Sequence, residues 1–266
     1  MELLDLFGLL AAPLTYLVMA VIEKLRPART FPERPGWQWT GMAFLLTIMS
    51  LGIAVPLLLP EAWLEPRRWI DGTRLGIVGG AIVGYVMLQF GVYAWHRSAH
   101  NVNFMWRAFH QIHHSPQRVD IPGSNVFHPF EMLAYTALLL FVTVIVLGLE
   151  PVAAAIVGYL FAFGGMFQHW NVRTPQWIGY ILQRPESHCV HHRRGVHYFN
   201  YADFAPIDLL FGTWRNPKEY RGECGFDSPA DRRMLPMIAL ADVNEPLYGA
   251  GSRGARPRDQ AGTQPA

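Results

Sequence analysis

The chain has 266 residues, of which 51% are hydrophobic, and its formal net charge is only +2. Such a small charge, without a basic stripe interleaved with aromatic residues, argues against nucleic acid as a partner. The two cysteines, Cys189 and Cys224, form neither a CxxC motif nor a disulfide framework. Because the apolar residues are clumped in long segments, the composition predicts a single integral membrane domain.

Five apolar segments are long enough, or nearly so, to cross a bilayer, since a spanning helix needs about 20 apolar residues. They cover residues 4–22, 41–59, 76–95, 132–149 and 151–167. The first segment is the weakest because Asp5 and Pro13 interrupt it. The sequence therefore predicts an all-α fold, a polytopic bundle of four or five transmembrane helices.

The charges between the segments predict the orientation of the bundle. Four basic residues follow the first segment: Lys24, Arg26, Arg29 and Arg34. The positive-inside rule places this loop in the cytoplasm, so segments 76–95 and 151–167 both end on the cytoplasmic side. The external loop 60–74 then also carries arginines. Since arginine far outnumbers lysine, a bias typical of GC-rich genomes, we expect a bacterial inner membrane protein with a histidine-rich helical cap facing the cytoplasm.

The eleven histidines all lie between residues 96 and 197, and most form one HxxxH and two HxxHH motifs near the ends of membrane segments. In a helix, residues three or four apart share a face, so each motif can direct its imidazoles toward one ion. Imidazole is also the commonest metal ligand near neutral pH. The pattern therefore predicts a metal site. The motifs comprise His96 and His100, then His110, His113 and His114, and finally His188, His191 and His192.

Further motifs surround these blocks between Gly84 and Trp214. In chain order they are H-R-S-A-H at 96–100, H-Q-I-H-H-S at 110–115, N-V-F-H-P-F-E at 125–131, Q-H-W-N at 168–171, P-E-S-H-C-V-H-H at 185–192, and H-Y-F-N-Y followed by D-L-L-F-G-T-W within 197–214. Their order and spacing resemble the fatty acid hydroxylase and sterol desaturase superfamily of membrane di-iron enzymes. Members often carry an acidic residue shortly before HRxxH, whereas this chain has Q-F-G-V-Y-A-W there.

The resemblance implies a set of site residues. His128 and His197 match family positions as ligands or as groups that support ligands, and Asn125 and Glu131 would orient neighbouring imidazoles. Nine imidazoles suit two metal ions with four or five ligands each. The implied metal ligands are His96, His100, His110, His113, His114, His169, His188, His191 and His192.

The resemblance also implies the chemistry. Two iron ions and O₂ as co-substrate would hydroxylate a C–H bond of a membrane lipid, either fatty acyl, sterol-like or polar, with desaturation as the alternative outcome. The sequence has no CxxCH, no ferredoxin-like cysteine run, no dinucleotide-binding glycines and no HPGG motif. Electrons are therefore expected from a separate donor, of ferredoxin or cytochrome b5 type with a reductase.

The remaining segments complete the expected organisation. Residues 1–75 would form N-terminal transmembrane helices and a loop, 76–236 a fatty acid hydroxylase-type catalytic region, and 237–266 a disordered tail. Residues 174–182 are apolar but too short to span, which favours an interfacial helix beside which a lipid could enter. Asp208 is expected to hydrogen-bond locally, and Arg97 to contact a headgroup or a carboxylate.

Two other classes of function stay open at this point. A metal transporter would need polar ligands at mid-membrane depth, and the second to fifth segments have essentially none; a non-catalytic metal-binding membrane protein belongs to the same class. A zinc-dependent hydrolase usually uses three ligands, often with a carboxylate, whereas this set is larger and all histidine. Metal analysis under anaerobic conditions would separate these alternatives.

Overall fold

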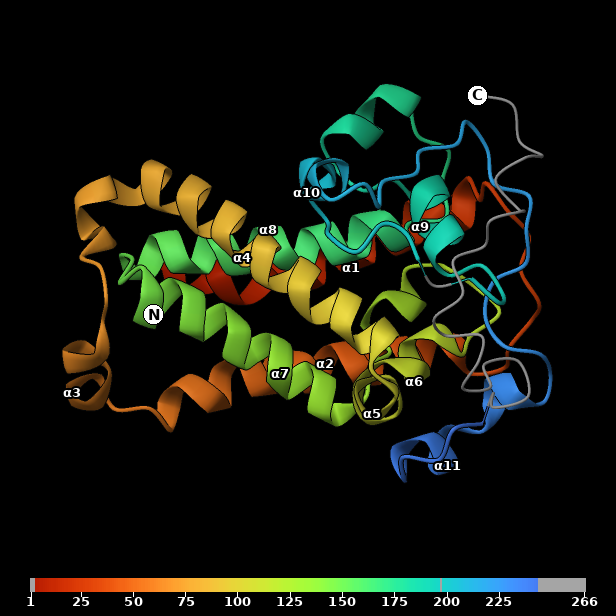
Figure 1. The fold of residues 1–266 in the computed structure, drawn as a ribbon, viewed down its shortest axis with the longest axis horizontal. Helices are drawn as coiled ribbons and strands as arrows, with labels where there is room; N and C mark the ends of the chain where they lie inside the picture. Colours follow the sequence, from red (N-terminus) through yellow and green to blue (C-terminus); the bar gives the residue numbers. More distant parts are fainter. Residues whose placement is uncertain (1–2, 197, 244–266) are drawn as a thin grey trace.

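A computed structural model describes residues 3–196 and 198–243. Over these residues the chain is helical, and its only extended pairings are two isolated bridges, Leu182 with Phe204 and Arg193 with Cys224. The all-α prediction is confirmed for this part of the chain. Long helices run side by side along the longest axis of the molecule, and shorter ones gather at one end (Figure 1).

Five long helical stretches form the bundle. They are α1 (Leu3–Leu25), α2 (Trp37–Leu57), α4 (Gly76–Asn101), α7 (Pro129–Leu140) with the π-helical turn η5 (Phe141–Val146) that continues it, and α8 (Pro151–His169). Within the described residues, four stretches are long and apolar enough to cross a membrane: Trp37–Leu57, Gly72–Asn101, Pro129–Val146 and Pro151–His169. The helix α1 packs along α8, and its Thr15 hydroxyl lies 3.1 Å from the Tyr159 hydroxyl.

Local sequence explains where the central helices begin and how closely they approach. The helices α7 and α8 each start with a proline, whose missing N–H costs nothing in the first turn. The helices α4 and α8 meet at small residues, because a Cβ on Gly84 would lie 2.8 Å from Val157. Leu88 of α4 and Ala153 of α8 are fully buried in the core between α4, α7 and α8.

The short elements link the bundle helices or build the cap. At the end opposite the cap lie α3 (Glu61–Leu64), η1 (Glu65–Arg67) and η2 (Gly72–Leu75). We call the segments after α4 and after α8, residues 102–128 and 170–243 as far as the structure describes them, the cap. Its elements are α5 (Asn103–Met105), the π-helical turn η3 (Trp106–His110), α6 (Gln111–His114), η4 (Pro122–Asn125), η6 (Gln176–Tyr180), α9 (Pro185–His191), α10 (Ala205–Leu210), η7 (Ala230–Arg232) and α11 (Met234–Ile238).

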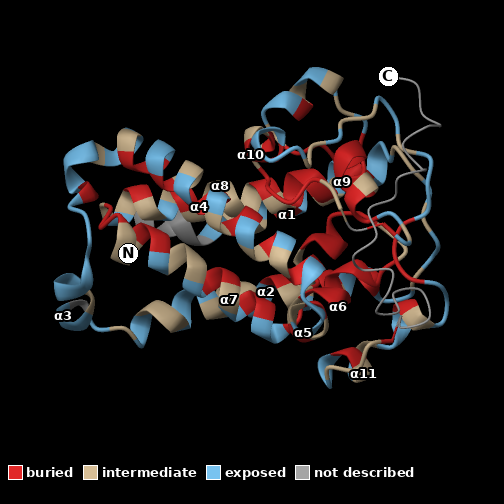
Figure 2. Cartoon of the chain, in the orientation of Figure 1, coloured by how far each residue is buried: buried red, intermediate tan, exposed pale blue. Residues whose placement is uncertain are grey.

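Burial differs between the two halves of the molecule. Buried residues concentrate in the cap around α6 and α9, whereas the bundle exposes much of its outer surface (Figure 2). That outer surface carries large apolar side chains, including Leu46, Val78 and Ile82. Apolar residues facing outward along helices of spanning length are typical of lipid contact. The chain is therefore an integral membrane protein.

The C-terminal boundary differs from the expectation that a loop-like tail begins at residue 237. Met237 is fully buried, and Arg107 and Gln111 donate hydrogen bonds to the carbonyls of Leu240 and Ala241. Residues 237–243 thus belong to the cap, because α11 supplies an apolar side chain to the core and the next turn satisfies polar groups of η3 and α6. The rest of the expected tail, 244–266, lies outside the described residues.

Candidate metal centre

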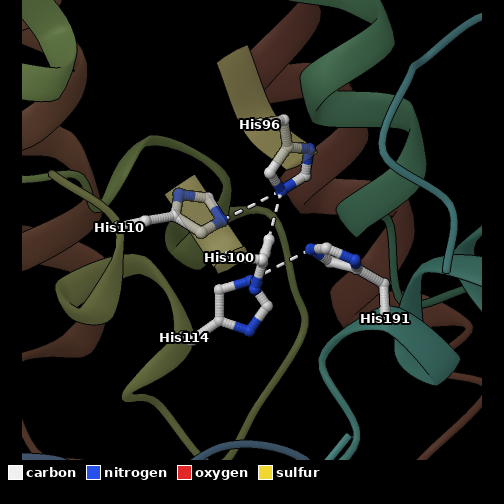
Figure 3. Close-up of side chains that lie close together, drawn as sticks. All are labelled: His96, His100, His110, His114 and His191. Atoms are coloured by element: carbon white, nitrogen blue, oxygen red, sulfur yellow. Dashed lines mark hydrogen bonds between the residues drawn. The ribbon is translucent and has the colours of Figure 1, made fainter. Parts of the chain in front are cut away.

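Nine histidines form two adjoining groups at the junction of bundle and cap. Within each group the candidate ligand atoms all lie within 4.8 Å of one another, and every member is buried. Figure 3 shows the rings of the larger group converging on a common space. The larger group contains His96, His100, His110, His114 and His191. The smaller group contains His113, His169, His188 and His192.

The helices bring some of these residues together as their spacing predicts and divide others between the two groups. His96 and His100 lie one turn apart near the end of α4, and His169 is the last residue of α8. The π-helical turn η3 ends at His110, immediately before α6. The prediction that each HxxHH motif directs all its imidazoles toward one ion is wrong. Residues four apart, such as His110 and His114, share a group, whereas His113 of the same helix α6 belongs to the other group. Each HxxHH motif therefore contributes ligands to both groups.

Backbone carbonyls fix the protonation of several imidazoles. The Nδ1 atoms of His96 and His191 lie 2.7 Å from the carbonyl oxygens of Tyr201 and Phe199. The Nδ1 atom of His169 lies 2.7 Å from the carbonyl oxygen of Gly165. A carbonyl can only accept, so in each case Nδ1 carries the proton. The lone pair of the neutral ring is then on Nε2, which points into the group.

A carboxylate and a further carbonyl do the same for two other rings. His110 Nδ1 lies 2.7 Å from Glu131 Oε1, and both side chains are almost completely buried. His113 Nδ1 lies 3.3 Å from the carbonyl oxygen of Val126. Partners of this kind orient metal-binding histidines and raise their basicity. The predicted orienting role of Glu131 thus has a specific contact.

The distances between Nε2 atoms suit a shared cation. His96 and His110 approach to 2.9 Å, and His113 and His169 to 3.2 Å, although all four rings direct an Nε2 lone pair inward. Two lone pairs at that separation repel one another unless a positive charge lies between them. Metal–nitrogen bonds of about 2.1 Å at right angles would place the nitrogens about 3 Å apart. The donor set therefore fits a metal ion in each group.

The surroundings keep the imidazoles neutral, as metal binding requires. Burial lowers the pKa of His113, His114, His188 and His192 well below the usual value for histidine, and neighbouring imidazoles lower it further. A neutral ring offers its lone pair without first losing a proton. Both groups therefore contain neutral imidazoles whose lone pairs are available to bind a cation.

The segment 199–208 is a part of the site that sequence reasoning missed. Besides the carbonyls of Phe199 and Tyr201, it contains Asp208, whose carboxylate accepts hydrogen bonds from the backbone N–H groups of Tyr201 and Ala202 at 2.9 and 2.8 Å. Asp208 thus bonds locally, as expected, and holds the loop that orients His96 and His191. The motifs H-Y-F-N-Y and D-L-L-F-G-T-W marked this part of the sequence, but they did not indicate these backbone contacts.

A second support for this segment is a buried network around Asp203. Its carboxylate accepts from Gln89 at 3.0 Å and from Gln168 at 2.8 Å, and burial raises its pKa to about 6. Gln89 occupies the stretch before His96 where members of the superfamily often have an acidic residue. Here an acid from a distant loop, Asp203, meets Gln89 of α4.

The other predicted site residues lie outside the two groups. His128 caps α7: its Nδ1 accepts from the N–H of Phe130 at 3.1 Å, and its Nε2 lies 3.2 Å from the carbonyl of Ile238. Asn125 bonds to the Ser124 hydroxyl and lines the cavity described next. Arg97 donates to the Tyr93 hydroxyl at 2.9 Å, and its charge also acts on the carboxylate of Asp208. His197 lies outside the described residues.

A cavity of about 290 Å³ reaches the histidines from within the bundle. At one end it is lined by histidines of both groups, including His110 and His169, and at the other by apolar residues of α2, α7 and α8, including Gly52, Leu140 and Gly158. From Gly158 to His169 the helix α8 rises about 16 Å, at 1.5 Å per residue. The cavity is thus a long apolar space that ends at the candidate metal centre.

Comparison with known proteins identifies the family to which this arrangement belongs. The family model described as fatty acid hydroxylase matches residues 81–213, half of the chain. Ornithine lipid hydroxylase OlsE of Rhizobium tropici is 28% identical over 92% of this chain and 78% of its own length. Human alkylglycerol monooxygenase is 32% identical over 51% of this chain, and very-long-chain aldehyde decarbonylase GL1-5 of Oryza sativa subsp. indica is 28% identical over 59%.

The extent of these matches differs between relatives. The matched part of human alkylglycerol monooxygenase is 30% of that protein, and that of the rice decarbonylase is 27%. No solved structure matches the chain. The family match over residues 81–213 contains all the histidines of the two groups.

Proposed function

The chain belongs to the fatty acid hydroxylase family of oxidoreductases, and from this premise we propose that it is a membrane-bound di-iron oxygenase that hydroxylates a C–H bond of a lipid. One observation carries the proposal: two groups of inward-directed imidazoles lie at the closed end of an apolar cavity inside a membrane bundle. The relatives named hydroxylase and monooxygenase support the same reaction type.

The proposed metal ligands are the nine histidines of the two groups. A set of neutral nitrogen donors without a carboxylate in either group suits iron, and five and four donors leave coordination positions for small molecules. Two bound iron ions would supply O₂ activation and the oxidising power that side chains lack. Glu131 and the carbonyls of Phe199 and Tyr201 would hold the rings in place while the metal changes charge.

The cavity supports a lipid substrate and suggests how it lies. The apolar end of the cavity lies within the bundle, and its end lined by histidines lies at the cap. A lipid in the leaflet next to the cap has the same orientation, with its tail toward the middle of the bundle and its headgroup toward the cap. A lipid entering between the helices would thus keep its orientation, with carbons near the headgroup beside the histidines. Leu45, Met49 and Phe161 would surround its chain and exclude water.

The proposal includes a partner and a location. Electrons would come from a separate donor of ferredoxin or cytochrome b5 type with a reductase. The region 76–236 would be catalytic, extended by the packed residues up to 243, and residues 1–75 would complete the bundle. The excess of arginine over lysine supports a bacterial inner membrane, and the basic residues after α1 support a cytoplasmic position of the cap.

The decisive experiment joins lipid analysis to metal analysis. Lipids of cells that express the chain, or its His191→Ala variant, would be compared by mass spectrometry, and the protein purified anaerobically would be assayed for iron. We expect a lipid whose mass is increased by 16 Da, one oxygen atom, only in cells that express the unaltered chain. We also expect iron in the unaltered protein. A mass decrease of 2 would indicate desaturation, and protein without a transition metal would refute the proposal.

A further inference from the structure

An exposed apolar surface lies on the flank of the cap, away from the cavity. It is formed by η6 and α10, which lie next to each other beside the cap end of α8 (Figure 1). Trp177 of η6 is 65% exposed, and Leu210, the last residue of α10, is 68% exposed. We call this surface the platform; its exposed residues are Trp177, Tyr180, Ile181, Leu209, Leu210 and Phe211.

The platform is rigidly built. The indole N–H of Trp214 donates to the carbonyl of Gly179 at 2.8 Å, and its ring lies 5.0 Å from that of Tyr180. The backbone N–H of Ala205 donates to the carbonyl of Ile181 at 3.1 Å. Two segments far apart in the sequence are thereby fixed side by side with their apolar side chains outward. These apolar side chains are therefore exposed because the fold holds them outward, and not because the segments are poorly packed.

The charges around the platform are basic. Residues 173–182 and 209–218 contain three charged side chains, Arg173, Arg215 and Lys218, all exposed. Glu219 follows directly, but it is paired with Arg221 at 2.9 Å. An apolar centre with tryptophan and tyrosine, bordered by cations, matches the interface of a bilayer that contains anionic lipids.

The platform also continues the lipid-facing surface of the bundle. Phe211 stacks on Tyr93 of α4 with ring centroids 4.6 Å apart, and Phe204 lies 6.1 Å from Tyr85 of the same helix. Ile82 and Val78, three and seven residues before Tyr85 and so on the same face of α4, are exposed. Because the platform is continuous with the outer face of a spanning helix, lipid is a more natural partner for it than a soluble protein.

We propose that the platform lies in the interfacial layer of the bilayer that the bundle spans. Its apolar side chains would be among the upper acyl chains, and Arg173, Arg215 and Lys218 would contact the phosphates of anionic lipids. The expected interfacial helix at 174–182 is thus extended by a second segment, α10. Because Asp208 of α10 holds the loop whose carbonyls orient His96 and His191, the bilayer would steady one wall of the metal centre.

The test measures immersion and requires neither metal nor turnover, so its outcome is independent of the proposed reaction. Spin labels would be attached after Leu210→Cys and, separately, Trp177→Cys substitution in protein reconstituted in nanodiscs containing anionic lipid. Phe90→Cys would give the lipid-facing reference and Glu223→Cys, whose side chain is 78% exposed, the aqueous reference. The unsubstituted chain would check that the buried Cys189 and Cys224 do not react.

We expect the labels at 210 and 177 to be accessible to oxygen and protected from a water-soluble relaxation agent, as at position 90. Accessibility like that at position 223 would overturn the proposal. Protection from both agents would indicate a protein partner and would overturn it as well.

A second arm tests the role of the basic residues. Immersion of the label at 210 should be greater in anionic than in zwitterionic nanodiscs, and Arg215→Glu should abolish that difference. Arg74→Glu makes the same charge change at an exposed position at the opposite end of the molecule and should preserve it. Equal immersion in both lipids would refute the proposed contact with anionic phosphates.

Discussion

At the scale of single residues, the Nδ1 atom distinguishes three histidines of the two groups from His128, which lies outside them. In His96, His169 and His191 it donates to a carbonyl, so Nε2 is a free base facing the group. In His128 it accepts from the N–H of Phe130, so the proton is on Nε2, which points to the carbonyl of Ile238. His128 has the opposite tautomer because it serves as a helix cap.

The residue-scale prediction concerns metal content. In protein purified anaerobically, His191→Ala should reduce metal bound by the larger group, and His113→Ala by the smaller, so that each binds about one ion fewer per chain than the unaltered protein. His128→Asn, which preserves an acceptor for the cap, should keep full metal content. Metal per chain is measured by mass spectrometry of the digested protein. If His128→Asn lost as much metal as His191→Ala, the division of roles would be incorrect.

At the scale of elements, the position of η4 depends on a close approach to α2. A Cβ added to Gly41 would lie 2.6 Å from backbone atoms of Pro122. One added to Gly52, about three turns along the same helix, would meet nothing within 4 Å. The loop that begins at Pro122 supplies Ser124 and Asn125 to the wall of the cavity. Glycine is thus required at one point of α2 and merely tolerated at another.

The element-scale prediction compares these two glycines. Gly41→Ala should destabilise the protein by about 1–3 kcal/mol, because backbone atoms must move apart. Gly52→Ala should be neutral or stabilising by up to about 1 kcal/mol, since alanine favours the helix. Thermal unfolding in the same detergent measures both as shifts of Tm in opposite directions. Equal shifts would show that α2 and η4 are not packed as described.

At the scale of the whole molecule, the bundle and the cap meet at the candidate metal centre. Apolar residues of the bundle line most of the cavity, and histidines line its other end. A lipid of the adjacent leaflet would fit this space with its headgroup toward the cap. Chain length should therefore be limited by the apolar end, and the site of oxidation by the polar end.

The prediction at this scale follows from filling the apolar end. A Cβ on Gly158 would lie 3.4 Å from Leu139, so Gly158→Phe projects a large ring into the cavity. We expect this variant to prefer shorter chains while hydroxylating the same position relative to the headgroup. Gly79→Phe, on α4 away from the cavity, is the control and should leave the preference unchanged. The products are analysed for a series of substrates of different chain length. A position of hydroxylation that stayed constant relative to the chain end, and not to the headgroup, would contradict the proposed binding orientation.

The sequence by itself determined the membrane helices, the family and the histidine motifs, because these depend on local composition and on spacing along the chain. It also placed both histidine blocks at one end of the bundle, since the number of crossings between them follows from the apolar segments. These inferences need no knowledge of how helices pack. The structure brings the predicted residues His96 and His191 together accordingly.

Only the tertiary structure decided how the histidines divide and what supports them. His113 and His114 are adjacent in the chain and belong to different groups, and His128, in a motif like the others, caps a helix. The carbonyls of Phe199 and Tyr201, and the platform built from η6 and α10, likewise depend on contacts between distant segments. Backbone carbonyls have no residue identity, so no sequence pattern could reveal which of them orient the metal centre.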